Sequence, residues 1–287
     1  MREYQTSFFH DSALFVPVTA LRPSKKYQSA VVSLVNNDNR GVCLRLRRND
    51  IMQPTIYDDI SQLLSLLGVE PQSVDLVVDY GFINTEKPST DRMRMVFSRL
   101  PRWRSFTVVA GTFPKDLTKY QRNDIYELDR NDWLFWLNDV RNITEFPTSP
   151  NYGDYTIQHA KYDPRLAFFE PSASVRYTSD MKCIIMKGEK PSNEGASSAA
   201  DQYRAHSQIL VERREYKRSK ASYGDDYFYY LSTGAKVGTA ETVLRAGINH
   251  HITHVVHQIA NLSDISAVAE PLHEADQEVR PLQAVHK

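Results

Sequence analysis

Cysteine is nearly absent from this chain, which has only Cys43 and Cys183 among its 287 residues. Two thiols without a CxxC pair cannot build the disulfide framework of a small secreted domain. The first residues, MREYQTS, do not resemble a signal peptide. No apolar run approaches the roughly 20 residues that a membrane-spanning helix needs. These absences predict a cytoplasmic protein with reduced thiols and no membrane partner.

An excess of charge of one sign is also missing, because 35 Lys and Arg residues balance 35 Asp and Glu residues. A balanced chain is not expected to bind nucleic acid or an anionic membrane over its whole surface. None of the motifs GxGxxG, GxxxxGK[ST] and GxSxG occurs, so the sequence indicates neither a nucleotide cofactor nor a serine nucleophile. The cofactor, if there is one, stays unknown at this stage.

Apolar strand-like segments alternate with helical patterns through the first 155 residues. Strands are expected over 15–21, 41–47, 74–80 and 105–111, and helices over 58–67, 91–100 and 131–140. Residues 27–35 fit either a strand or a helix. This alternation is typical of a parallel βαβ sheet, and nearly continuous apolar strands suggest that both faces are covered.

A closed (β/α)-barrel needs eight strand–helix units, whereas this stretch holds four or five. We therefore predict an α/β fold, either the later units of an incomplete TIM-like barrel or an open sheet. After Tyr155 the pattern changes to short strands over 174–179 and 183–187 and helices over 201–212 and 246–260. The predicted domains are a partial barrel (1–160), a C-terminal α+β extension packed on it (161–262) and a loosely ordered tail (263–287).

Functional sites of barrels lie at the carboxyl ends of the strands. Arginines there can bind a phosphate or carboxylate, and carboxylates can transfer protons. The segment 151–155 is expected to be a turn after the last strand. The candidate ligand-binding residues are Arg45, Arg47, Gly153, Asp154 and Tyr155, and the candidate catalytic residues are Asp79, Asp154 and His251. The alternative is that Arg45, Asp79 and their neighbours form structural ion pairs.

Four histidines lie in the last predicted helix. His250, His254 and His257 share one face at spacings that can hold Zn²⁺. However, the sequence HHITH lacks the glutamate of HExxH, and a third ligand one turn further would strain tetrahedral geometry. His251 is expected to point elsewhere, towards solvent. We therefore favour a packed or solvated helix face and predict no metal ligand.

A basic segment, Arg213–Lys220, lies among tyrosines. Basic residues with aromatic neighbours can bind single-stranded nucleic acid through charge and stacking. A charge run of this kind is more often the solvated end of a helix. Nucleic-acid binding is therefore an alternative that we do not favour.

Five segments together resemble the Beta protein family of phages, prophages and bacterial genomes, which is unrelated to the Beta single-strand annealing recombinase. They are Pro147–Tyr155, Val175–Asp180, Ile184–Gly188, Ser222–Asp225 and Arg245–His251. Their order and spacing agree along most of residues 15–260, although Leu244 stands where a tryptophan is expected. The resemblance implies a TIM-barrel-like domain with a C-terminal extension and a place in conflicts between phage, prophage and host.

The resemblance also implies further strand–helix units in front of those seen here. We therefore expect a missing N-terminal segment or a second chain to complete the barrel. It singles out Gly153, Asp154 and Tyr155, together with His250 and His251, as positions to test first.

Three functions follow as hypotheses. The first is binding in phage–host conflict or defence. The second is a barrel enzyme acting on a phosphate-bearing small molecule or nucleotide, in which Asp79 or His251 carries the proton. The third is a nucleic-acid-binding accessory protein. Convergence of Arg45, Asp79 and Asp154 in one pocket would favour the enzyme, and separate pairing would favour binding.

Overall fold

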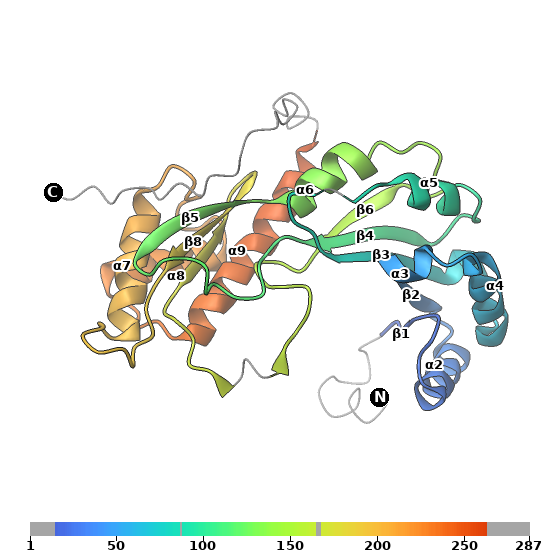
Figure 1. Cartoon of the computed structure of the whole chain (residues 1–287), viewed down its shortest axis with the longest axis horizontal. Helices are drawn as coiled ribbons and strands as arrows, with labels where there is room; N and C mark the ends of the chain where they lie inside the picture. Colours follow the sequence, from blue (N-terminus) through green and yellow to red (C-terminus); the bar gives the residue numbers. More distant parts are fainter. Residues whose placement is uncertain (1–14, 87, 165–167, 263–287) are drawn as a thin grey trace. The chain divides into compact units, whose positions relative to one another are not determined.

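The computed structural model describes residues 15–86, 88–164 and 168–262 (Figure 1). The chain divides into two compact units: unit 1 consists of Met1–Gly111 and Asn131–Asp154, and unit 2 of Thr112–Arg130 and Tyr155–Lys287. The chain therefore passes from one unit to the other three times. The domain boundary predicted at residue 160 stays a prediction, and the predicted tail lies outside the described residues.

Unit 1 is built on a five-stranded sheet in the order β1-β2-β3-β4-β6, in which all neighbours are parallel. The strands are β1 (Val18–Thr19), β2 (Val42–Arg47), β3 (Val74–Phe82), β4 (Ser105–Gly111) and β6 (Pro150–Asp154). The predicted α/β class and the parallel sheet are confirmed. Among the described residues β1 and β6 are edge strands, and the incomplete TIM-like barrel stays a prediction.

Short helices connect these strands. They are α2 (Lys25–Asp38), α3 (Arg48–Ile51), α4 (Ile56–Leu67), the 3₁₀ turn η1 (Pro71–Ser73), α5 (Asp91–Phe97), α6 (Asn131–Phe135) and the π-helical turn η2 (Trp136–Val140). The ambiguous segment 27–35 lies within α2, where the Ser24 hydroxyl accepts the N–H of Tyr27 as an N-cap. The predicted cap of α4 is confirmed, because Gly68 adopts the left-handed conformation with φ 64°.

The two faces of the sheet in unit 1 are not equally covered. Side chains on one face, such as Leu44, Leu76 and Val108, are at most 1% exposed. The alternate residues, such as Val77 and Val109, are only half-buried. One face of the sheet is therefore dry, and the other, which was also expected to be covered, is only partly so.

The segment 151–155, expected to be a turn, lies almost wholly within strand β6. Gly153 has no left-handed φ, so a turn does not explain this glycine. A Cβ atom there would lie 2.7 Å from Val109 Cγ2 and 3.0 Å from Thr107 Cγ2. The close approach of the β4 side chains therefore favours glycine at this position. The change of direction follows at Thr156, whose φ is 58°.

Unit 2 combines a three-stranded antiparallel sheet with helices α7, α8 and α9 (Figure 1). The strands, in sheet order, are β5 (Asp124–Asp129), β8 (Lys182–Lys187) and β7 (Val175–Thr178), and the helices are α7 (Ala199–Glu212), α8 (Tyr223–Thr233) and α9 (Ala240–Ala260). Their shared core includes Tyr177, Met186, Phe228 and Leu231, each fully buried. In the described part of the chain, no helix is both long enough and apolar enough to cross a membrane.

Candidate functional site

The polar residues at the strand ends of unit 1 are bonded to one another. Arg45 Nε donates to Asp79 Oδ2 at 2.9 Å, and Gly81 N–H donates to Asp79 Oδ1 at 2.8 Å. Asp79 is only 5% exposed, so this ion pair fixes the end of β3. Arg47 is exposed at the end of β2, where its backbone N–H donates to Asp50 Oδ2 at 2.8 Å.

Asp79 and Asp154 lie on opposite faces of the sheet. Asp79 is the register partner of Val109, and Val109 is the partner of Gly153. Because successive strand residues point to opposite faces, the neighbour Asp154 faces away from Asp79. The structure therefore does not bring Arg45, Asp79 and Asp154 together.

Asp154 instead bonds to a tyrosine on the dry face of the sheet. Tyr152 Oη lies 2.8 Å from Asp154 Oδ2 and 2.8 Å from Asp132 Oδ2. The Tyr152 ring packs edge-on against Trp133 and Trp136, with centroid distances of 5.0 and 5.5 Å. The candidate Tyr155 directly follows β6 and is the first residue of the second segment of unit 2. The strand-end residues thus form separate local contacts.

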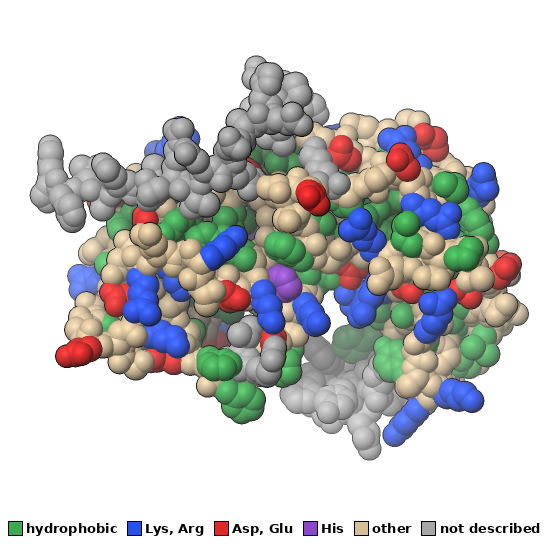
Figure 2. All heavy atoms as spheres, viewed as in Figure 1, with side chains coloured by type: hydrophobic (Ala, Val, Ile, Leu, Met, Phe, Trp, Pro, Cys, Tyr) green, Lys and Arg blue, Asp and Glu red, His purple; other side chains and the backbone are tan. Residues whose placement is uncertain are grey.

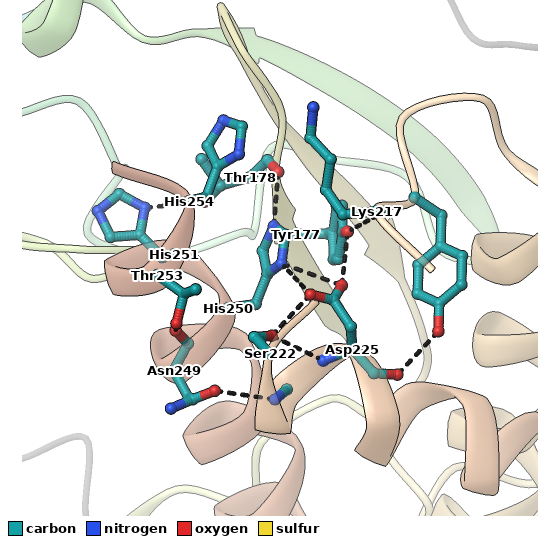
Figure 3. A network of polar contacts seen from close by, with 12 residues as sticks. Tyr177, Thr178, Lys217, Ser222, Asp225, Asn249, His250, His251, Thr253 and His254 are labelled. Atoms are coloured by element: carbon teal, nitrogen blue, oxygen red, sulfur yellow. Dashed lines mark hydrogen bonds and ion pairs between the residues drawn. The ribbon is translucent and has the colours of Figure 1, made fainter. Parts of the chain in front are cut away.

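Unit 2 contains a buried polar network around Asp225, in the first turn of α8 (Figure 3). Ser222 Oγ accepts the Asp225 N–H at 3.0 Å and donates to Asp225 Oδ2 at 2.6 Å. Tyr177 Oη donates to Asp225 Oδ1 at 2.7 Å and accepts the Lys217 backbone N–H at 2.9 Å. Burial raises the pKa of Asp225, but hydrogen bonds from His250, Ser222 and Tyr177 outweigh it and hold the pKa below its ordinary value.

His250 has both ring nitrogens engaged. Nδ1 lies 3.1 Å from Asp225 Oδ2, and Nε2 lies 2.8 Å from the carbonyl oxygen of Thr178. Both nitrogens therefore face oxygen atoms of the protein itself. The ring stacks on the Tyr177 ring at a centroid distance of 3.7 Å. His250 is thus held by three contacts within unit 2.

Two glycines allow this network to form. A Cβ at Gly224 would lie 2.1 Å from the carbonyl oxygen of Ala246, and one at Gly247 would lie 2.8 Å from that of Arg176. Glycine therefore lets α9 approach both α8 and β7 closely. Asn249 strengthens the first contact, since its Oδ1 accepts the Gly224 N–H at 2.9 Å. The close packing brings α9 side chains against the network.

The other histidines of α9 have different surroundings. His251 is 2% exposed and its Nδ1 lies 2.8 Å from Thr178 Oγ1, so the prediction that it faces solvent was wrong. His257 is exposed. Because both nitrogens of His250 are engaged, the three histidines at helical spacing do not form a ready ligand set. Within residues 15–86, 88–164 and 168–262, no group of three or more His, Cys, Asp or Glu side chains could hold a metal ion.

A pocket of about 860 Å³ opens over the network in unit 2. Polar groups reach it from β5, from the β7–β8 turn, from the start of β8, from the segment after α7, from helices α8 and α9, and from Asn261 just after α9. Its polar lining residues are Glu127, Ser179, Asp180, Lys182, Arg214, Glu215, Lys217, Asp225, His250, Thr253, His254, His257, Gln258 and Asn261. This size suits a small organic ligand.

His254 is a third buried titratable group of this pocket, beside Asp225 and His250. Its side chain is 5% exposed, and its Nε2 lies 3.4 Å from Asp180 Oδ1. That approach is not a hydrogen bond, and Nε2 makes none within the described structure. Burial first, and then the charges of Arg130, His250 and Lys217, lower the pKa of His254 to about 3. His254 is therefore neutral at physiological pH, and its pairing with Asp180 is not ionic.

The basic segment Arg213–Lys220 is not a bare cationic strip. Arg213 Nη2 pairs with Glu127 at 2.6 Å, Arg214 Nε with Glu215 at 3.1 Å, and Lys217 Nζ with Asp180 at 3.2 Å. On the face seen in Figure 2, basic and acidic side chains are interspersed. Because these basic side chains are already paired with carboxylates, the segment gives little support to the nucleic-acid alternative.

Tyr177, Asp180, Lys217 and Asp225 were not among the candidate site residues, although they lie in segments that the sequence analysis singled out, Val175–Asp180, Arg213–Lys220 and Ser222–Asp225. One signal was present for Asp225, because Ser222 followed three residues later by a carboxylate is typical of a helix N-terminus. The others are brought together only by the antiparallel pairing of β7 and β8 and by the packing of α9, which no local pattern encodes.

Comparison with known proteins gives one match. The family model described as Beta protein matches residues 2–257, which is most of the chain, and confirms the resemblance noted in the sequence. No curated protein and no solved structure matches the chain.

Proposed function

Since this chain belongs to the Beta protein family, we propose that it acts in the conflict between phages, prophages and their bacterial hosts. It acts by binding, and its binding site is the pocket of unit 2. Family membership supports the setting, because the resemblance implies it. The geometry of the two units supports the mode of action.

One observation carries this proposal: polar groups from strands β5 and β8, helices α8 and α9 and the loops of unit 2 converge on one pocket of about 860 Å³. The candidates of unit 1 behave differently, because Arg45 and Asp79 bond to each other and Asp154 faces the other side of the sheet. Because these three residues do not converge, the structure of unit 1 favours a binding protein over an enzyme whose active site lies at the strand ends. His250 adds to this, since both of its ring nitrogens are already engaged within the protein, by Asp225 and by the carbonyl oxygen of Thr178.

The test is a plating assay in bacteria that produce the full chain, challenged with a panel of phages. The blocking variant is Ala221→Trp, which places a large side chain at an exposed position of the pocket wall. Its matched control is Ala30→Trp, an exposed alanine on α2. We expect the wild type and the control to change phage plating at least tenfold, and the blocking variant to lose that effect. No effect of the wild type, or an equal effect of both variants, would contradict the proposal.

The sheet of unit 1 is proposed to be part of a TIM-like barrel that a second chain, or a further segment of strand–helix units, completes. Two features support this: one sheet face is only half-buried, and β1 is a two-residue edge strand whose Val18 is 45% exposed. Exposed parallel edges invite pairing with another strand. Light scattering of the purified chain is expected to give a mass above 33.0 kDa or visible aggregation. A well-behaved monomer would count against the completed barrel.

A further inference from the structure

We infer that the pocket of unit 2 contains an oxyanion subsite, formed by Lys217 and His254, that binds the phosphate group of a nucleotide-sized ligand. In the structure this position is taken by the carboxylate of Asp180. The inference rests on the proposed function in one respect only, which is that this pocket is a binding site. It adds the chemical class of the ligand and a residue that competes with it.

The geometry places one carboxylate oxygen between two nitrogen atoms. Asp180 Oδ1 lies 3.2 Å from Lys217 Nζ and 3.4 Å from His254 Nε2. Both nitrogens belong to residues that line the pocket. An oxygen at this position can receive hydrogen bonds from an ammonium and from an imidazole, which together are suited to an anion.

Asp180 is held by its backbone and not by its side chain. Its carbonyl oxygen accepts hydrogen bonds from Arg130 Nη1 at 3.1 Å and from Gln258 Nε2 at 2.9 Å. These bonds fix the turn between β7 and β8. The side chain itself is 67% exposed, and ion pairs at exposed positions contribute little to stability. The carboxylate can therefore rotate into solvent without any movement of the backbone.

His254 supplies the second, independent observation. Its side chain is 5% exposed, and its Nε2, at the pocket wall, makes no hydrogen bond to any described residue. Most buried polar atoms have partners, so this nitrogen is available to bond a group that enters the pocket. A phosphate oxygen in the place of Asp180 Oδ1 could approach more closely and complete this bond.

The electrostatic surroundings favour an anion. Arg130, His250 and Lys217 all act on His254 as positive charges, and Asp180 alone acts as a negative one. Removal of Asp180 from the subsite therefore leaves a net positive region. The carboxylates at the far wall, Glu127 and Glu215, are already paired with arginines.

Proton uptake should accompany binding. An anion next to Nε2 favours the charged form of His254, whose pKa burial and three cations depress in the free protein. The groups that face the same space include Lys182, Arg214 and His257, and His257 is exposed. Inorganic sulfate separates the effect of His254 from titration of the ligand, because its charge is constant above about pH 3. The affinity for sulfate is therefore expected to rise as the pH falls from 8 to 5, and the rise is expected to be smaller in His254→Gln.

Calorimetric titration of the full chain tests the subsite, with AMP as the phosphate-bearing probe and adenosine as the same probe without phosphate. We expect AMP to bind at least tenfold more tightly than adenosine. Lys217→Ala should weaken AMP binding at least tenfold, whereas Asp180→Asn should strengthen it several-fold, because a competing charge is removed. Lys190→Ala is the matched control, since this exposed lysine of unit 2 does not line the pocket.

The sign of the Asp180→Asn effect distinguishes a competitor from a structural residue. Weaker AMP binding in Asp180→Asn, or equal binding of AMP and adenosine, would overturn the inference. So would a loss in Lys190→Ala as large as that in Lys217→Ala. Inorganic phosphate as a third probe separates the two sources of the anion: binding as tight as that of AMP would overturn the nucleotide-sized ligand.

The outcomes for the subsite and for the proposed function are separable. If Ala221→Trp abolishes the effect on phage plating but AMP does not bind, the pocket is functional and the phosphate ligand is wrong. If AMP binds with the expected pattern but plating never changes, the subsite stands and the role in phage–host conflict fails.

Discussion

The two units use polar residues in opposite ways. In unit 1 the charged groups at the strand ends satisfy each other locally, as Arg45 and Asp79 do. In unit 2 a buried ion pair between His250 and Asp225 supports a pocket in which Lys217 pairs with an exposed carboxylate and, among the described residues, His254 Nε2 makes no hydrogen bond. The comparison teaches that polar side chains at the strand ends of unit 1 bond to their neighbours, whereas those of unit 2 line a common pocket.

The largest effect is expected from loss of one partner of the buried ion pair. His250→Ala leaves the Asp225 carboxylate, which is 1% exposed, without its charged partner. Breaking a buried pair in this way costs about 3–5 kcal/mol. Urea denaturation should show a correspondingly lower free energy of unfolding. His257→Ala, an exposed histidine of the same helix, should change it by less than about 0.5 kcal/mol.

Two glycine substitutions compare the packing of the units. Gly224→Ala places a methyl group 2.1 Å from a backbone oxygen, which cannot move without shifting α9. Gly153→Ala places one 2.7 Å from the Val109 side chain, which can yield. Overpacking costs about 1–3 kcal/mol of stability. We therefore expect Gly224→Ala to lower the free energy of unfolding by about 3 kcal/mol or more, and Gly153→Ala to lower it by about 1 kcal/mol. The double variant Gly153→Ala/Val109→Ala should show a smaller packing cost at Gly153 than the single one. An unchanged cost would mean that Val109 is not the obstacle.

The pH dependence of stability should originate in unit 2. Burial lowers the pKa of His206 to about 4, and burial with neighbouring cations lowers that of His254 to about 3. Both pKa values lie below the unfolded value of about 6.5, so the unfolded chain binds more protons as the pH falls. Stability is then fully present above about pH 6.5 and is lost progressively below it.

Denaturation midpoints measured between pH 7 and pH 5 provide the check. Each of the two histidines should contribute roughly 1 kcal/mol of lost stability per pH unit in the lower part of this range. His206→Gln and His254→Gln should each reduce the slope. If neither variant changed the slope of stability against pH, the pH dependence would originate in groups other than these two histidines.

The smallest effect is expected at the half-exposed member of the unit 1 ion pair. Arg45→Ala removes a side chain that is 38% exposed, while Asp79 keeps its bond from the Gly81 N–H. Partly exposed pairs contribute about 0–1 kcal/mol, and thermal unfolding should show no larger loss. If Arg45→Ala destabilised the chain as much as His250→Ala, the contrast between the units would fail.

Local sequence patterns predicted those elements that are determined by residues close together in the sequence. Strand β4 was predicted at its observed bounds because Ser105–Gly111 is an apolar run between breakers. Helix α4 was found through its apolar spacing and through Gly68. Strand β6 was missed because Pro150 and Gly153 are usual in turns. Its register with β4, which supplies the reason for the glycine, is a contact over more than 40 residues.

The candidate site shows the same limit. The spacing of the α9 histidines identified a shared face, but their partners come from β7, from α8 and from the β7–β8 turn. Asp225 is 25 residues from His250, and Thr178 is 72 residues away. Which histidine is charged, and which has an unbonded nitrogen, depends on these distant partners. No pattern within the helix contains that information.

The pairing of strand β5 has a further consequence for folding during synthesis of the chain. Strand β5 precedes β6 in the chain but pairs with β8, so Asp129 can pair only after Lys182 has been synthesised. The ribosome must add 53 more residues, 182 minus 129, before the partner strand begins to appear. At about 5–20 residues per second, this leaves a nascent strand without its neighbour for several seconds. During that interval the hydrogen-bonding groups of β5 that later pair with β8 are without that partner.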